Sequence, residues 1–286
     1  MMYTNKEHVK LLVWGEILWD LFPDGPELGG APANVAWHLA MLGADVALVS
    51  RVGDDERGHD AIARLKARGV DTSLVQIDPE RATGEVRVST QAGEPKYTLV
   101  PGRAWERIAC TGEVRDALDR ASAVVFGTLS QITDDGFASW RAMIAAAPAG
   151  CAKVCDVNLR PKHLDHRAID AALACADVLK INDGEVAALG RTPTAKILAR
   201  THGPRGATIT TAHETVEIAG IDARPGGDNV GCGDAWLAVF VHGLTQGWPL
   251  ARTGAIASRW AAEVASHRGA TPDFPAELIS VMLGAP

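Results

Sequence analysis

Apolar runs alternate along the chain with segments in which apolar residues recur at helical spacing. Residues 10–14 form a short apolar run that ends at a glycine, and residues 29–43 open with glycines and Pro32 and close on another glycine. The first pattern is typical of a buried strand and the second of a helix. The same patterns predict further strands at 45–50, 121–126, 153–157 and 177–181, and further helices at 56–68, 134–147 and 165–175.

Strands that alternate with helices in this way form parallel sheets. The expected fold class is therefore α/β, with a doubly wound, mainly parallel central sheet flanked by helices. The C-terminal third is expected to add short helical pieces over 183–200, two strands near 207–211 and 215–219, and two closing helices at 231–246 and 249–267.

Residues 85–100 interrupt the alternation with two β-rich runs around Gly93-Glu94-Pro95. This pattern predicts an antiparallel hairpin, and a hairpin inserted into a strand–helix series is usually an appendage such as a lid. We expect one domain over 1–286, with a small β lid built from about 16–28 and 84–104.

The composition is that of an ordinary globular protein, with 286 residues and a formal net charge of −7. The negative charge disfavours a broad nucleic-acid surface. We find no apolar run of membrane length, and the N-terminal segment lacks the apolar core of a signal peptide. These features predict a cytoplasmic protein with neither a nucleic acid nor a membrane as partner. The five cysteines form no CxxC pair, which fits this setting, and Cys151 and Cys155 are expected to be buried thiols.

The segment 226–244, GGDNVGCGDAWLAVFVHGL, runs from a glycine-rich loop into an apolar helical pattern. Glycines allow backbone N–H groups to converge on one point, and a helix N-terminus adds partial positive charge there. The loop is therefore predicted to bind an anion, with the carboxylate of Asp234 beside it.

Other polar groups follow the predicted strands, where an α/β enzyme places its site. They are Glu16, Asp20, Asp156, Asn158, Arg160, Asn182 and Glu185. Each has a structural alternative, since Asp near a helix start is commonly a cap and Asn-Asp-Gly is ordinary turn chemistry. The sequence contains no G-x-x-x-x-G-K-[ST] phosphate loop, and Gly29-Gly30-Ala31 does not match the dinucleotide motif G-x-G-x-x-G.

Six segments resemble, in order, the motifs of the ribokinase-like (PfkB) carbohydrate kinase family, and they are most similar to those of fructokinases. The two longest are GGAPANVAWHLAMLGADVALVSRVGDDERG at 29–58 and DNVGCGDAW at 228–236, which is similar to the family signature D-T-x-G-A-G-D-x-F. The four shorter ones are GEILWD at 15–20, DVNLRP at 156–161, NDGE at 182–185 and THGPRG at 201–206. The resemblance covers essentially the whole chain.

The resemblance implies an ATP-dependent sugar kinase that uses Mg²⁺ and a monovalent cation such as K⁺. Its implied catalytic groups are the base Asp234, the backbone N–H groups of Gly231, Cys232 and Gly233, and Arg160. The implied sugar contacts are Asp20, Gly29, Gly30 and Asn34. The implied nucleotide and Mg²⁺ residues are Asn182, Glu185, Gly203, Gly206 and Ser258, and the monovalent cation would be held by Asp228, Val230 and carbonyls near 265–269. Asn34 has an alternative role as a buried helix amide, and Arg160 as a surface ion pair.

The chain departs from the family pattern at Asn229, Cys232 and Trp236, and the stretch 191–226 is shortened. The shortening concerns the nucleotide pocket and the cation site. Cys232 has two interpretations. Its thiol is either a small stand-in for alanine that faces the core, or a thiol that faces the phosphate site with a pKa lowered by the helix N-terminus.

The expected function is phosphorylation of a primary hydroxyl of a small sugar by ATP, with fructose the leading candidate. Ribose, 2-keto-3-deoxygluconate and a nucleoside are alternative acceptors within the class. A catalytically inactive sugar-binding relative is the alternative from another class. Because an exposed β appendage often pairs with a second copy, the expected protein partner is another copy of the chain, bound through the lid.

Overall fold

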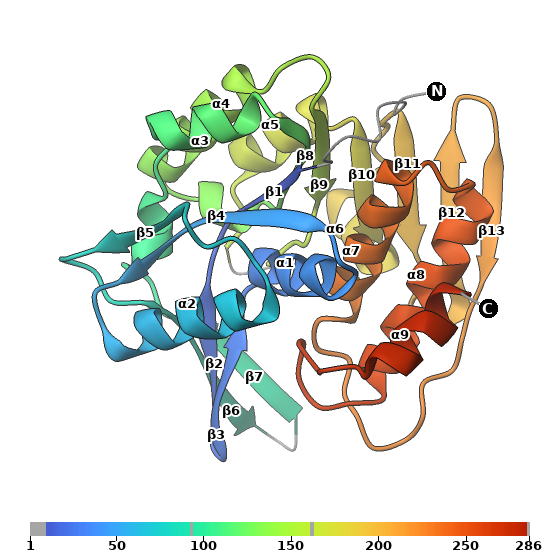
Figure 1. The fold of residues 1–286 in the computed structure, drawn as a ribbon, viewed down its shortest axis with the longest axis horizontal. Coiled ribbons are helices and arrows are strands. Elements are labelled where there is room, and N and C mark those ends of the chain that lie inside the picture. The colour runs from blue at the N-terminus through green and yellow to red at the C-terminus, as the bar shows by residue number, and fades with distance from the viewer. Residues whose placement is uncertain (1–9, 92–93, 161–162, 285–286) are drawn as a thin grey trace.

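The computed structural model of the protein describes residues 10–91, 94–160 and 163–284. Within these residues, nine strands form one sheet in the order β13-β12-β11-β10-β9-β8-β1-β4-β5 (Figure 1). Their bounds are β1 Lys10–Trp14, β4 Asp45–Gly53, β5 Val75–Asp78, β8 Ala121–Phe126, β9 Ala152–Asp156, β10 Val178–Asn182, β11 Ile197–Thr201, β12 Gly206–Thr211 and β13 Thr215–Ala219. The pairs from β5 across to β11 are parallel, and only the pairs of β12 with β11 and β13 are antiparallel in this part of the chain.

Helices cover both faces of the sheet, as the period-2 alternation along the strands requires. Leu11 and Val13 of β1 pack into one core with α1 (Ala31–Met41), α2 (Glu56–Arg68), α7 (Cys232–Thr245), α8 (Leu250–Ala265) and α9 (Ala276–Leu283). Leu12 and Trp14 pack into the other core with α3 (Gly112–Leu118), α4 (Asp134–Ala146), α5 (His166–Cys175) and α6 (Asp183–Leu189). The predicted doubly wound α/β class is confirmed.

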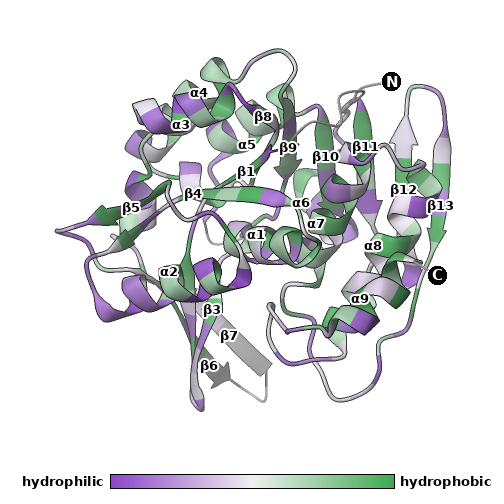
Figure 2. Ribbon diagram, viewed as in Figure 1, coloured by the Kyte–Doolittle hydropathy of each residue, from purple (hydrophilic) through white to green (hydrophobic). Residues whose placement is uncertain are grey.

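Hydropathy follows this arrangement. Figure 2 shows hydrophobic residues concentrated on the central strands, while α2 alternates between hydrophobic and hydrophilic residues. In α2 the buried residues are Gly58, Ala61 and Leu65, so one face of the helix packs against the core. No helix among the described residues is long and apolar enough to cross a membrane.

A second sheet, the lid sheet, contains β2 (Leu18–Phe22), β3 (Gly25–Gly29), β6 (Gly84–Gln91) and β7 (Glu94–Leu99) in the order β3-β2-β6-β7. It projects below α1 and α2 in the view of Figure 1. The strands β2 and β3 are antiparallel, β2 and β6 are parallel, and β6 and β7 form the predicted hairpin. The tip of that hairpin, at 92–93, lies outside the described residues.

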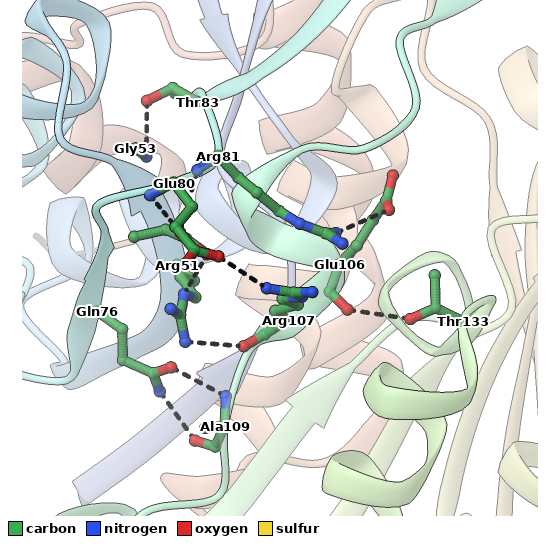
Figure 3. Close-up of polar contacts among 11 residues, drawn as sticks. Arg51, Gly53, Gln76, Glu80, Arg81, Thr83, Glu106, Arg107, Ala109 and Thr133 are labelled. Atoms are coloured by element: carbon green, nitrogen blue, oxygen red, sulfur yellow. Dashed lines mark hydrogen bonds and ion pairs between the residues drawn. The ribbon is translucent and has the colours of Figure 1, made fainter.

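The root of the lid sheet is held by polar contacts that Figure 3 shows in close-up. Gly53 N donates to Thr83 Oγ1 at 3.0 Å, directly before β6 begins. Arg81 reaches Glu106 at 3.4 Å. Arg51 pairs with Asp78 at 2.9 Å. These residues lie in β4, in β5, just before β6 and after β7, so their contacts tie the lid sheet to the edge of the central sheet.

Two features of the C-terminal third differ from expectation. Residues 197–201 form strand β11, which pairs in parallel with β10, although the local sequence Lys196 to Arg200 has helix-forming residues. Pairing with a neighbouring strand outweighs such local propensity. A third closing helix, α9, follows Pro275 and ends at Gly284. Strand β5 and helix α3 were also not predicted.

Candidate active site

A cavity opens where the carboxyl ends of β1, β8 and β9 meet the N-terminus of α1. From β1 the chain passes to β4 on one side and later to β8 on the other, so the cavity lies at the topological switch point of the sheet. Its lining residues are Val13, Glu16, Ala31, Pro32, Val35, Val125, Phe126, Gly127, Thr128, Leu129, Asp156, Asn158, Arg160 and Leu237. Four of the polar residues predicted from the sequence therefore surround one cavity.

The anion loop, residues 228–234, leads into the N-terminus of α7. Gly231 is the N-cap residue and has a φ of 72°, a left-handed conformation that favours glycine. A Cβ atom at Gly231 would lie 2.4 Å from the Cβ atom of Ala270. The loop therefore needs glycine here for its conformation and for its close packing, and the first N–H groups of α7 have no partner within the helix.

Asp234 lies in the first turn of α7 and accepts a hydrogen bond from Asn34 Nδ2 at 2.8 Å. Asn34 lies in the first turn of α1, so this contact joins the N-termini of two helices. Both side chains are buried. Burial raises the pKa of Asp234 to about 6, and the neighbouring Asp156 raises it as well, while Lys180, Asn34 and Arg160 oppose the rise. Asp234 is therefore a stronger base than an ordinary aspartate.

Lys180 was not predicted as a site residue. It is a buried lysine in β10, and its Nζ atom donates to both carboxylate oxygens of Asp156, at 3.0 and 2.9 Å. A lysine in an otherwise apolar parallel strand, VLKIN, is the signal that could have identified it, because buried charges need partners.

The side chain of Asp20 in β2 reaches the backbone of Gly29 in β3, although Asp20 is paired with Glu27 in the strand register. A Cβ atom at Gly29 would lie 2.5 Å from Asp20 Oδ2, so the carboxylate rests against the backbone that leads into α1. Gly30, the N-cap residue of α1, has a φ of 103°. Burial raises the pKa of Asp20 to about 6, with Arg160 opposing. Burial also raises the pKa of Glu16, which lines the cavity, to about 7.

Asn182 and Glu185 form a capping box at the start of α6. Asn182 Oδ1 accepts from Glu185 N at 2.9 Å, and Glu185 Oε2 accepts from Asn182 N at 2.8 Å. Glu185 Oε1 accepts from Leu159 N at 2.9 Å, which ties α6 to the segment that carries Arg160. Both oxygens of Glu185 thus have backbone donors. The described residues contain no group of three or more His, Cys, Asp or Glu side chains that could hold a metal ion.

Asp228 connects the anion loop to the segment that follows α8. Its Oδ1 accepts from Val230 N at 2.9 Å, its Oδ2 accepts from Gly269 N at 3.1 Å, and its own N donates to His267 O at 3.0 Å. The structure therefore brings together the elements that the resemblance implied for a monovalent cation, namely Asp228, Val230 and the backbone near 265–269.

The remaining nucleotide residues lie on other elements. Gly203 opens the turn between β11 and β12 with a φ of 60°, and Gly206 closes it. Ser258 is buried in α8, where its Oγ accepts the indole N–H of Trp236 at 3.2 Å. None of the three lines the cavity described above.

The interpretation of Cys232 as a thiol with a lowered pKa is wrong, because its pKa is raised. The thiol is partly buried, and its Sγ atom lies 4.0 Å from the carbonyl oxygen of Asp228. Burial and the charges of Asp228 and Asp234 raise the pKa of Cys232 to about 12. The alternative, a small residue standing in for alanine, agrees with this environment.

Comparison with known proteins places the chain among sugar kinases. The model of the pfkB family carbohydrate kinases matches residues 26–277. Fructokinase-2 of Oryza sativa is 30% identical over 266 residues, which cover 82% of this chain and 79% of the rice protein. An uncharacterized sugar kinase from Pyrococcus horikoshii, solved in complex with ATP, has a TM-score of 0.83 and 26% identity and covers 91% of this chain and 94% of that one.

A fructokinase from Vibrio cholerae, solved with fructose, ADP and calcium, shares the fold with a TM-score of 0.80 and 22% identity, over 96% of this chain and 99% of that one. The family match spans most of the sequence, and the segments that resemble the family motifs meet at one edge of the sheet. The chain belongs to the pfkB family of carbohydrate kinases and is a phosphotransferase.

Proposed function

We propose that the protein transfers the γ-phosphoryl group of ATP to a primary hydroxyl of a small sugar, with fructose the leading candidate. The observation that carries the proposal is the buried hydrogen bond between Asn34 and Asp234, which joins the first turns of α1 and α7. It fixes a basic carboxylate next to a glycine-rich helix N-terminus. The fructokinases among the relatives favour fructose over ribose, 2-keto-3-deoxygluconate or a nucleoside.

Asp234 acts as the base for the sugar hydroxyl. Its Oδ2 is occupied by Asn34, which leaves Oδ1 to accept the hydroxyl proton. With a pKa of about 6, the carboxylate is ionised at neutral pH yet binds a proton more readily than an ordinary aspartate. Because the transition state of phosphoryl transfer is loose, orienting the hydroxyl matters as much as removing its proton.

Asp20, Gly29 and Gly30 bind hydroxyl groups of the sugar other than the one that faces Asp234. A short carboxylate that lies against a glycine backbone suits hydrogen bonds to neighbouring hydroxyl groups. Arg160 carries a positive charge that acts on both Asp20 and Asp234, so it lies between the sugar and phosphoryl positions in this proposal.

The backbone N–H groups of Gly231, Cys232 and Gly233 stabilise the transferring phosphoryl group. Donors fixed in advance at a helix N-terminus cost no reorganisation during the reaction. Mg²⁺, when bound, neutralises phosphoryl charge, and it would be held mainly by the phosphates and by water near Asn182 and Glu185. The donor set fits this arrangement, because both oxygens of Glu185 are used by backbone N–H groups.

The remaining residues implied by the family resemblance bind the nucleotide and a monovalent cation in this proposal. Gly203 and Gly206 bind the nucleotide, and Ser258 lies near its adenine ring. Asp228 and Val230 hold a monovalent cation such as K⁺. The lid sheet closes over the sugar as part of one domain, and two copies pair through it. The free thiols of all five cysteines support a cytoplasmic setting.

The test is coupled ADP release with a panel of fructose, ribose, 2-keto-3-deoxygluconate and adenosine. We expect the highest kcat/KM with fructose. A higher kcat/KM with another sugar would reassign the substrate. Sugar binding without ADP release, measured by calorimetry, would favour the inactive sugar-binding alternative.

A further inference from the structure

The mechanism proposed above leaves a buried ion pair without a role. Lys180 of β10 and Asp156 at the end of β9 have side chains that are each only 6% exposed. The Nζ atom of Lys180 contacts both carboxylate oxygens of Asp156, at 3.0 and 2.9 Å. Removing two charges from water is costly, and a pair of neutral apolar residues would fill the same space at a lower cost. The pair therefore requires an explanation beyond stability.

The pair lies directly behind the anion loop. A Cβ atom at Gly233 would be 2.8 Å from Lys180 Nζ and 3.6 Å from its Cε, so the lysine side chain packs on the backbone at the start of α7. Gly233 is the residue before Asp234. The ammonium group thus faces the backbone that carries both the phosphoryl donors and the base.

Asp234 is surrounded by charged groups from every neighbouring element. Asp156 from β9 raises its pKa, and Lys180 from β10 lowers it. Asn34 from α1 donates a hydrogen bond, and Arg160 from the segment after β9 adds an exposed positive charge. The charge of Asp234 also acts on Glu16, Asp20 and Cys232, and Glu185 from α6 interacts with both members of the ion pair.

Two cations face these carboxyl groups, and they differ in exposure. Arg160 is exposed and lines the cavity. Lys180 is buried, and Asp156 fixes its position. A fixed charge in a region without water acts more strongly than a mobile one in solvent. Lys180 is therefore the cation whose effect on Asp234 persists whatever Arg160 binds.

We infer that Lys180 is a positioning residue for phosphoryl transfer: its ammonium, fixed by Asp156, supports the anion loop at Gly233 and keeps Asp234 ionised, while Asp156 acts on Asp234 in the opposite direction. This inference rests on the proposed function, in which Asp234 is the base. It assigns the two members of one ion pair opposite effects on the same carboxyl group.

The experiment compares Lys180→Met, Asp156→Asn and the double variant with the wild type. The acid limb of kcat/KM against pH is expected to move up by about one pH unit in Lys180→Met and down in Asp156→Asn. The double variant, which loses both charges, is expected to fall between them. The sugar KM at the pH optimum should stay within about threefold, since Asp20 is unchanged.

Lys153→Met is the matched control, because Lys153 is also a strand lysine but pairs with Asp177 at 4.0 Å at the other end of β9. It should leave the acid limb unmoved. Circular dichroism establishes that each variant is folded. If Lys180→Met does not fold, Asp156→Asn and the double variant still decide the question through the direction of their shifts.

Shifts in the same direction for Lys180→Met and Asp156→Asn, or no shift in folded variants, would overturn the inference. If the wild type releases no ADP with any sugar, the proposed function fails instead. The titration of Asp234 is then followed by ¹³C NMR of carboxyl-labelled aspartate, with the signal assigned by its absence in Asp234→Asn. Opposite shifts of that titration in the two variants would retain the charge effect, and any other result would reject it.

Discussion

Charged side chains are buried at the carboxyl edge of the central sheet and exposed at the β2–β3 turn of the lid sheet. At the sheet edge, Lys180 and Asp156 are each 6% exposed, and Asp234 is buried against Asn34. At the turn between β2 and β3, Asp24 pairs with Arg268 of the segment after α8, and both side chains remain more than half exposed, Arg268 at 54% and Asp24 at 57%. Arg268 also reaches Glu27 of β3 at 3.0 Å.

The two regions therefore differ in how strongly a charge acts on its neighbours. Buried charges at the sheet edge change the pKa values of their neighbours strongly, and they hold one geometry because water cannot replace them. The exposed pair of Asp24 and Arg268 is screened by salt and contributes little, so this turn can vary without loss of the fold. We therefore expect substitutions at the sheet edge to affect turnover, and those in the lid to affect mainly sugar preference and local stability.

The largest effect is expected for Asp234→Asn. The amide cannot accept the hydroxyl proton, so kcat should fall by about 10³-fold or more, as is usual when a general base is lost. ATP affinity should stay within a few-fold, because the backbone donors proposed for phosphate belong to Gly231, Cys232 and Gly233 and not to Asp234. Steady-state kinetics and ATP titration measure the two quantities. A near-normal kcat would exclude Asp234 as the base.

The sequence was most informative where backbone conformation dictates residue type. Gly231 has positive φ and packs against Ala270, so only glycine suits the position, and the motif could be identified before the structure. The regular βαβ elements were equally predictable, because their periodicity and end residues agree.

The missed features depend on contacts between distant segments. Strand β11 forms because β10 offers a partner, which no local pattern of 197–201 reveals. The Lys180–Asp156 pair joins residues 24 positions apart, and the hydrogen bond from Asn34 to Asp234 joins residues 200 apart. The raised pKa of Cys232 likewise comes from burial, which its place at a helix start did not suggest.

The next largest effect is expected for Asp20→Ala. Loss of a charge-assisted hydrogen bond to the sugar should cost about 1.5–3 kcal/mol, or roughly 10- to 150-fold in kcat/KM for the sugar. The KM for ATP should change little, because Asp20 lies in the lid sheet and faces Gly29. Kinetics at varied sugar and fixed ATP measure the loss. Unchanged sugar kinetics would leave Asp20 with a structural role alone.

Glu16→Gln is expected to change stability in a pH-dependent way. The folded-state pKa of Glu16, about 7, lies above its ordinary value of 4.5, so its contribution to stability is present below 4.5 and is lost as the pH rises through 7. Glutamine does not titrate. The variant should therefore gain on the wild type between about pH 5 and pH 8, by at most about 3 kcal/mol. Urea unfolding at both pH values measures the gain, and an advantage that is equal at both would contradict the buried, titrating carboxyl group.

The smallest effect is expected for Arg268→Ala, which removes the pair between the segment after α8 and Asp24 at the β2–β3 turn of the lid sheet. Its pair with Asp24 is exposed on both sides, so the variant should lower Tm by less than about 2 °C, and 0.5 M salt should abolish even that difference. The matched comparison is Thr83→Val at the buried root of the lid sheet. There the valine would leave the N–H of Gly53 without its acceptor and the Oδ1 of Asp55 without the hydroxyl that donates to it at 2.6 Å. Because unpartnered buried polar groups are costly, Thr83→Val should lower Tm by several degrees at either salt concentration. A drop for Arg268→Ala as large as that for Thr83→Val would mean that the exposed pair, rather than the buried root, holds the lid sheet in place.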